Sequence, residues 1–233
     1  MPRISQFLFT FAALLLVLPA CRRTMSDELN QERIFCVYTL EYTAQEQRTY
    51  ALAEFRVRNV RGALLELATP SSVQFGGVNM LWDGELRRYQ RIQTARVDTG
   101  TFVWQDTDGA TYANSASIEN LQAEMPANFT QLRQSQAYTF AWEGAALQDG
   151  ELIALSIQPV DNSSASAKIY KEISTAGATS FEISASEIAQ LSPEAYRAQL
   201  TRTRARSAEE ATEAGGSTQA RYRTTWRNIE ILP

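Results

Sequence analysis

The sequence predicts an all-β protein built from antiparallel β-sandwich layers, with one short helix near residues 185–191. Three observations lead to this fold class. In residues 51–58 and in several later runs, apolar residues alternate with mostly polar ones, which is the period of a strand with one buried face. Asp-Gly pairs at 83–84, 108–109 and 149–150 supply the positive φ that tight hairpin turns need. Strong helix-start signals are scarce.

Residues 1–20 predict a secretory signal peptide. Arg3 gives a positive start, and residues 7–18 are apolar apart from Thr10, a run shorter than the roughly 20 residues that cross a bilayer. The run ends in Leu18-Pro19-Ala20-Cys21, which resembles the bacterial lipobox. The resemblance implies cleavage before Cys21, a diacylglyceryl group on its thiol and a further acyl chain, such as palmitate, on its amine. Cleavage after Ala20 by an ordinary signal peptidase is the alternative, because Pro19 departs from the lipobox pattern.

A lipid on Cys21 would attach the chain to a membrane effectively permanently, since each buried methylene contributes about 0.8 kcal/mol. Arg22 follows the cysteine, which by resemblance to enterobacterial sorting favours the cell outer membrane. The sequence does not distinguish the periplasmic face of that membrane from the cell surface. Residues 21–33 are polar and predict a tether that holds the folded part off the membrane.

Composition excludes several kinds of chemistry. The chain has no histidine, so Ser-His and Cys-His relays are excluded, and two cysteines do not make a structural zinc site. A net charge of −4 and a pI of about 5.1 argue against a nucleic-acid partner. We therefore predict no catalytic residue, no metal site and no cofactor. Cys36 lies among β-forming residues and is expected to be a buried small apolar side chain.

Two β domains are predicted after the tether. Residues 34–124 would form an N-terminal β domain and residues 128–233 a C-terminal β-sandwich, with a boundary near residues 125–128. One larger sandwich or a jelly roll is the alternative. The C-terminal domain shows six strand-like runs, at 136–142, 152–160, 167–173, 179–183, 196–205 and 219–232.

The link between the fourth and fifth runs carries two motifs. Ser184 and Glu187 form a capping box that starts the short helix, and Pro193 stops it. Residues 191–196, Leu-Ser-Pro-Glu-Ala-Tyr, resemble the tyrosine corner of immunoglobulin-like and fibronectin type III domains. The resemblance implies an immunoglobulin-like architecture for residues 128–233 and says nothing about a ligand.

Arginines on the last strands form the candidate binding site. In a strand, Arg202, Arg204 and Arg206 share one face, and Arg221 and Arg223 recur in the same way further on. If the two strands pair as a long hairpin, the five arginines form one basic stripe bordered by aromatic residues. Such a stripe suits an anionic glycan or the carboxylates of another envelope protein. A solvated strand face, neutralised by the acidic loop at 209–213, is the simpler alternative.

Paired carboxylates beside tryptophans give the strongest enzyme alternative. Asp83 and Glu85 beside Trp82, and Glu143 beside Trp142, have the composition of a glycosidase site, but each also suits a hairpin end. The run 106–109, Asp-Thr-Asp-Gly, is interpreted as a turn and not as a calcium loop, because Ser117 stands where such a loop has its bidentate Glu.

These observations predict a lipid-anchored module of the cell envelope that binds or supports and does not catalyse. Its organisation resembles envelope lipoproteins of Bacteroidota-type bacteria. The alternatives are a carbohydrate-active enzyme or its glycan-binding accessory, and a subunit of a larger envelope assembly.

Overall fold

The structure is a computed structural model that describes residues 24–161 and 167–233. More than half of the described residues lie in strands, and the described part holds a single short α-helix. The predicted fold class is therefore confirmed. The three smaller sheets are antiparallel, whereas the largest sheet is mixed because three of its strand pairs are parallel.

One 12-stranded sheet runs through the whole molecule. Its main order is β1-β4-β3-β2-β19-β18-β15-β16. These strands are Thr24–Met25, Leu64–Glu66, Arg48–Val57, Ile34–Thr43, Gly216–Arg223, Ala195–Ser207, Glu151–Pro159 and Ile169–Ile173. Beside β3 lie β8 (Arg88–Gln93) and its partner β7 (Leu81–Asp83), and beside β18 lie β20 (Arg227–Leu232) and then β12 (Gln131–Arg133).

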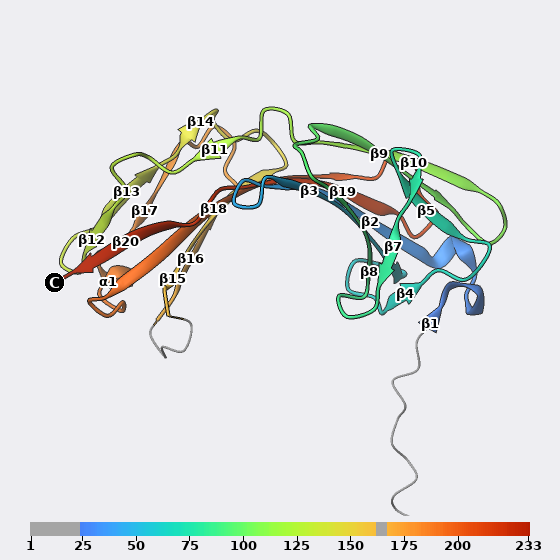
Figure 1. Cartoon of the computed structure of the whole chain (residues 1–233), viewed down its shortest axis with the longest axis horizontal. Coiled ribbons are helices and arrows are strands. Elements are labelled where there is room, and N and C mark those ends of the chain that lie inside the picture. Colours follow the sequence, from blue (N-terminus) through green and yellow to red (C-terminus); the bar gives the residue numbers. More distant parts are fainter. Residues whose placement is uncertain (1–23, 162–166) are drawn as a thin grey trace, which may run out of the picture.

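Three smaller sheets form a second layer over one side of this large sheet. The first has the order β10-β9-β5-β6, and the others pair β11 with β14 and β13 with β17. Their bounds are Thr111–Ser117, Thr99–Gln105, Ser72–Phe75, Val78–Asn79, Ala123–Glu124, Glu143–Gly144, Tyr138–Ala141 and Ser180–Ile183. The two layers curve into an arch, with the smaller sheets on the convex side (Figure 1). Among the described residues, no further sheet covers the concave face of the large sheet.

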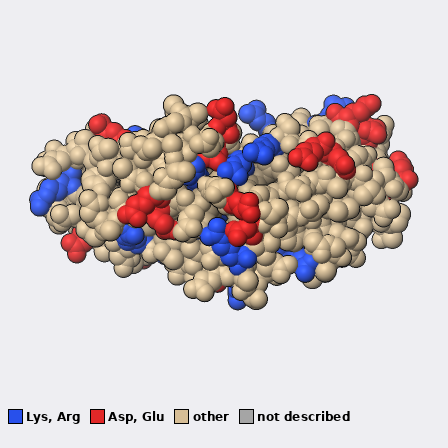
Figure 2. All heavy atoms as spheres, turned by 90° about the horizontal axis from the view of Figure 1, so that it is seen from above, with Lys and Arg blue, Asp and Glu red and all other residues tan. Residues whose placement is uncertain are grey.

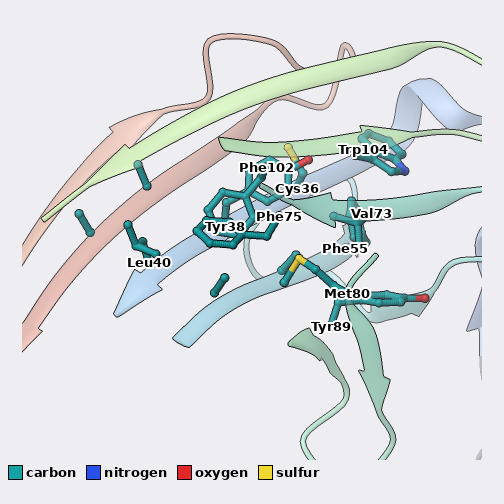
Figure 3. Packing of buried hydrophobic residues seen from close by; sticks show 14 of the residues in the cluster. Cys36, Tyr38, Leu40, Phe55, Val73, Phe75, Met80, Tyr89, Phe102 and Trp104 are labelled. Atoms are coloured by element: carbon teal, nitrogen blue, oxygen red, sulfur yellow. The ribbon is translucent and has the colours of Figure 1, made fainter. Parts of the chain in front are cut away.

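The N-terminal half of the arch is held by an aromatic core. Tyr38 stacks on Phe102 with ring centroids 5.0 Å apart, and Phe55 packs against Trp104 at the same distance. All four side chains are fully buried, and Figure 3 shows them between β2, β3 and the covering sheet. Burial of each such ring contributes about 1.5–3 kcal/mol, so this cluster is a main source of stability. Cys36 lies in the same cluster, as predicted for a buried small side chain, and its burial raises the pKa of the thiol to about 11.

The C-terminal half has its own core, in which the predicted corner and helix lie. The helix α1 is one turn, Ala185–Ile188, and both bonds of the Ser184–Glu187 capping box are formed. Tyr196 is fully buried, and its hydroxyl accepts a hydrogen bond from the backbone N–H of Ser192 at 3.2 Å. This is the bond expected of a tyrosine corner.

Strand β18 connects the two cores. Its first residues pair with β20 and its later ones with β19, which turns away and lies parallel to β2. Residues 219–232, predicted as one strand, are therefore two strands separated at Thr224. The Thr224 hydroxyl accepts from the Leu200 N–H, and the Thr224 N–H donates to the Leu200 carbonyl, both at 3.0 Å. The end of the chain thus contributes Ala220 and Tyr222 to the N-terminal core.

The predicted tether is wrong for residues 24–33. They form β1 and two 3-10 turns, η1 (Ser26–Glu28) and η2 (Gln31–Arg33), that pack on the sheet. Ser26 is fully buried and its hydroxyl accepts a hydrogen bond from the Ala68 N–H at 2.8 Å. The polar composition of these residues suggested a linker, but the side chains of Ser26 and Gln31 form buried hydrogen bonds with backbone groups. The signal peptide and Cys21 lie outside the described residues, among which no helix is both long and apolar enough to span a membrane.

Two of the three Asp-Gly pairs close hairpins. Asp83 is the last residue of β7, and its Oδ1 accepts from the backbone N–H groups of Glu85 and Leu86 before β8 begins. Gly109 has a φ of 87° between β9 and β10. Gly150 also has a positive φ, but it leads into β15, whose partners are β16 and β18 and not the preceding strand.

We predict that Tyr196→Phe lowers the free energy of unfolding by about 0.5–1.5 kcal/mol, because it removes the part-buried hydrogen bond from the Ser192 N–H. Urea unfolding followed by circular dichroism measures the change. Tyr170→Phe is the matched control: Tyr170 is 67% exposed, so loss of its hydroxyl is expected to cost less than about 0.5 kcal/mol. Equal effects of the two variants would contradict the corner's structural role.

Candidate functional site

The concave face of the large sheet is the candidate functional site. Side chains alternate along a strand, so residues next to the core positions point to this open face. On β2 the core takes Tyr38 and Leu40, and Glu41 points the other way. Across the sheet the open face carries mostly hydroxyl, amide and charged side chains, namely Thr39, Glu41, Thr43, Ser156, Gln199, Thr201, Thr203, Gln219, Arg221 and Arg223.

An ion-pair cluster lies at the centre of this face. Glu41 on β2 lies beside Arg221 on β19, and the Arg221 Nη1 lies 2.8 Å from the Glu41 Oε2. The Arg223 Nη2 reaches the same oxygen at 3.3 Å. The Glu41 side chain is only 11% exposed, and those of the arginines are about one third exposed, at 29% and 35%. One carboxylate therefore serves two guanidinium groups, which remain accessible from the concave side.

Two hollows extend from this centre in opposite directions. One, of about 350 Å³, reaches across β2 and β3 to Arg88 on β8, with Trp226 at its other side. The other, of about 380 Å³, reaches across β18 and β15 to Tyr170 on β16. Arg221 and Arg223 line both hollows. The result is a continuous trough across seven strands, from β8 to β16, with a length of roughly 30 Å from the usual spacing of strands.

Aromatic side chains line both hollows. In the second hollow Tyr170 is 67% exposed, and its hydroxyl donates to Glu172 at 2.9 Å. In the first hollow the guanidinium of Arg197 lies 4.7 Å from the centre of the Trp226 ring. Tyr50 lines the same hollow and donates its hydroxyl to Glu46. Ring faces together with many hydroxyl and amide groups suit a ligand that is itself amphipathic and rich in hydroxyl groups.

The five predicted anion-binding arginines do not form one stripe. In the β18–β19 hairpin, which forms as predicted, Arg221 is opposite Thr203 and Arg204 is opposite Ala220. Opposite residues of paired strands share a face, so Arg202, Arg204 and Arg206 point to the covering layer and Arg221 and Arg223 to the concave side. The single-stripe geometry is therefore wrong, because the register is offset by one residue from the one it required.

Arg202 and Arg204 are structural in this arrangement. Arg202 is 1% exposed, and its Nη2 and Nε contact the Glu151 Oε2. Its Nη1 donates to the Ala145 carbonyl at 2.9 Å, and its Nη2 also donates to the Ala146 carbonyl at 3.0 Å. Arg204 binds the other Glu151 oxygen at 2.7 Å. Arg206 is exposed and lines a separate hollow of about 160 Å³. The alternative expectation, a solvent-exposed strand face of arginines, is wrong for Arg202, which is buried.

Glu151 is the buried partner of both guanidinium groups. Burial raises the pKa of Glu151, but a hydrogen bond from the Gln148 N–H and the pairs with Arg202 and Arg204 outweigh it. Its pKa therefore lies below the usual 4.5. The carboxylate stays charged at neutral pH and compensates charges that would otherwise be buried alone.

Two of the three carboxylates of the enzyme alternative, Asp83 and Glu143, have a structural contact. Asp83 caps its turn and also accepts from the Gln90 amide at 2.7 Å. Glu143 accepts from the Ala127 N–H at 3.2 Å, and Trp142 is 5% exposed. Asp106 accepts from the N–H groups of Asp108 and Ala110, as expected of a turn. Within the described ranges no cluster of three or more acidic or cysteine side chains could hold a metal ion.

Seen from the convex side, basic and acidic side chains alternate and form no patch of one sign (Figure 2). The described surface there gives no second candidate for a charged ligand. Sequence reasoning missed Arg88 and Glu41 in the trough, whereas Trp226 was among the aromatic residues expected to border the arginines. The sequence alone could have placed Thr39, Glu41 and Thr43 on one face of a strand. It could not show that β8 and β19, which are distant in sequence, lie in the same sheet.

No protein-family model matches the chain, and no curated protein matches it. Among solved structures, a 1.5-MDa bacterial ice-binding adhesin aligns at 12% identity and a TM-score of 0.23, over 87% of this chain and 66% of that one. The fibronectin-III array of RIM-binding protein aligns at 10% identity and a TM-score of 0.24, over 84% of this chain and 67% of that one. SGBP-B of a Bacteroides ovatus mixed-linkage glucan utilization locus, bound to a heptasaccharide, aligns at 11% identity and a TM-score of 0.25, over 86% of this chain and 61% of that one. The chain spans about two thirds or less of their lengths, and similarity this low supports no transfer of function.

We predict that Glu151→Gln lowers the free energy of unfolding by about 3–5 kcal/mol at pH 7, because it leaves Arg202 buried without its counter-charge. Urea unfolding measures the loss. The control, Glu172→Gln on the exposed surface, is expected to stay within about 0.5 kcal/mol of the unchanged chain. A loss below about 1 kcal/mol would mean that the cluster does not stabilise the fold.

Acid should remove the contribution of Glu151 to the free energy of unfolding. Because its folded-state pKa is depressed, the carboxylate stabilises the fold above about pH 4.5, and this contribution disappears as the pH falls through the lower folded-state value. The difference in unfolding free energy between the unchanged chain and Glu151→Gln should therefore shrink between pH 7 and pH 3. Urea titrations across this range test it, and a difference independent of pH would refute the assignment.

Proposed function

We propose that this chain is a binding module of a bacterial cell envelope, attached to the outer membrane by a lipid on Cys21, which holds an extended glycan on its concave face and does not catalyse. The observation that carries the proposal is the continuous polar trough, about 30 Å long, across the open side of the large sheet.

The composition of the trough supports a glycan. Small hydroxyl side chains such as Thr201 and Thr203 form its floor, so a chain can lie close to the sheet. Amide and guanidinium groups offer hydrogen bonds, and the rings of Tyr170 and Trp226 offer flat apolar faces for sugar rings. A shallow site that follows a sheet suits a linear polymer better than a small compact ligand, which generally occupies an enclosed pocket.

The lipid anchor is supported by the sequence of residues 18–21. The first described strand begins at Thr24, three residues after Cys21, so a lipid on Cys21 would hold the sheet within roughly 10 Å of the membrane surface. This is closer than the predicted tether would have placed it. The position suits a module that retains a polymer next to the envelope.

The anchor is tested by growing bacteria that express the full chain with labelled palmitate. We expect label and membrane association in the unchanged protein and neither in Cys21→Ser, because lipidation requires the thiol. Mass spectrometry of the amino terminus provides the control for cleavage. A Cys21 that carries no lipid on either its thiol or its amine would exclude the lipid anchor.

Glycan binding is tested by electrophoresis of the full chain through gels that contain a panel of neutral and acidic polysaccharides. Tyr170→Ala should weaken retention about fivefold to tenfold, since an aromatic contact contributes about 1–1.5 kcal/mol. Leu86→Ala, an exposed apolar truncation outside the trough, should bind normally. Failure of every polysaccharide to retard the unchanged chain would exclude glycan binding.

A further inference from the structure

Two arginine nitrogens in the trough lack hydrogen-bond partners. The Nε atoms of Arg88 and Arg223 are both buried, and neither has an acceptor among the described residues. Both side chains line the same hollow, which also contains Glu41, Glu46 and Arg221. A buried N–H without an acceptor is costly, so two in one hollow require an explanation.

The charges in this hollow are unevenly matched. Glu41 is shared by Arg221 and Arg223, and Glu46 accepts the hydroxyl of Tyr50. Among the described residues, Arg88 has no ion-pair partner. Guanidinium groups stay protonated at all physiological pH values and only donate hydrogen bonds. Three arginines face two glutamates here, so the hollow carries a spare positive charge, and the guanidinium groups of Arg88 and Arg223 that line it can donate to a ligand.

The nearby amide groups do not supply the missing acceptors. The Gln199 amide nitrogen donates to the Thr224 carbonyl at 2.9 Å, and the Gln45 amide oxygen already accepts from the Trp226 N–H at 3.2 Å. The hollow has a volume of about 350 Å³, roughly ten times that of a water molecule in the liquid. A group the size of a sugar ring fits this space, and a bare ion would leave most of it empty.

We propose that this hollow binds a carboxylate carried by an acidic polysaccharide, with Arg88 and Arg223 as its ligands. The inference rests on the proposed glycan function and specifies which glycan. A carboxylate is flat and has two acceptor oxygens, so it matches the fork of donors on a guanidinium group. Arg223 also lines the second hollow, so a sugar chain held by its carboxylate here continues along the trough toward Tyr170.

The test compares two polymers with one backbone. The full chain is run through gels that contain polygalacturonate or its methyl ester, which has the same sugars without the charge. We expect retardation by polygalacturonate and at least tenfold weaker retardation by the ester. The net charge of −4 makes nonspecific attraction to a polyanion unfavourable, so retention reports a specific site.

Substitutions locate the effect in the hollow. Arg88→Gln and Arg223→Gln should each weaken binding to polygalacturonate about tenfold or more, and Arg88→Lys should retain part of it because the charge remains. Arg133→Gln removes the same charge from the exposed strand β12, far along the sheet, and should bind normally. Unchanged melting temperatures show that the variants fold.

Each other result overturns the carboxylate site. Equal retardation by the acid and the ester, with no effect of Arg88→Gln, would leave glycan binding in place and remove the site. Equal losses in Arg88→Gln and Arg133→Gln would show general charge attraction. If neither polymer retards the chain, the inference fails, and the panel of neutral polysaccharides then decides the broader function separately.

Discussion

Everything in this fold depends on the alternation of side chains along one 13-residue strand, β18. Its inward residues supply Tyr196, Ala198 and Leu200 to one core and then, where that core ends, two arginines. Those charges cannot face an apolar layer alone, so Glu151 on the adjacent strand pairs with both. Arg204 also reaches the carbonyls of Ser117 and Glu119 beyond β10, which connects the C-terminal half to the N-terminal layer. The buried ion pairs of Glu151 with Arg202 and Arg204 thus connect the two apolar cores.

The open trough is a consequence of the same alternation. Once β18 and β19 turn their inward residues to the cores, Thr201, Thr203, Arg221 and Arg223 must face the other way. Because β19 continues beside β2, the outward residues of both halves form one surface and not two separate ones. The proposed binding of a polymer rests on this continuity, and the proposed carboxylate site combines Arg223, which lines both hollows, with Arg88, which lines the first.

Local signals in the sequence predicted local structure well. The capping box at Ser184, the corner at Tyr196 and the hairpin of β18 and β19 all form as expected, because each depends on residues close together in the chain. Predictions that needed distant partners were less successful. Residues 24–33 look like a polar tether until β4 and Ala68 are present to pair with them. The arginine stripe failed because it required a hairpin register that composition does not reveal.

By itself the sequence determined the all-β class, the positions of most strands and the motif that ends in Cys21, since these follow from periodicity, turn chemistry and a short contiguous pattern. Only the tertiary structure decided which arginines are buried and which are exposed, because a shift of one residue in pairing exchanges the two faces of a strand. It also decided that Arg88 joins Arg223, two residues 135 positions apart whose encounter depends on the order of strands in the sheet.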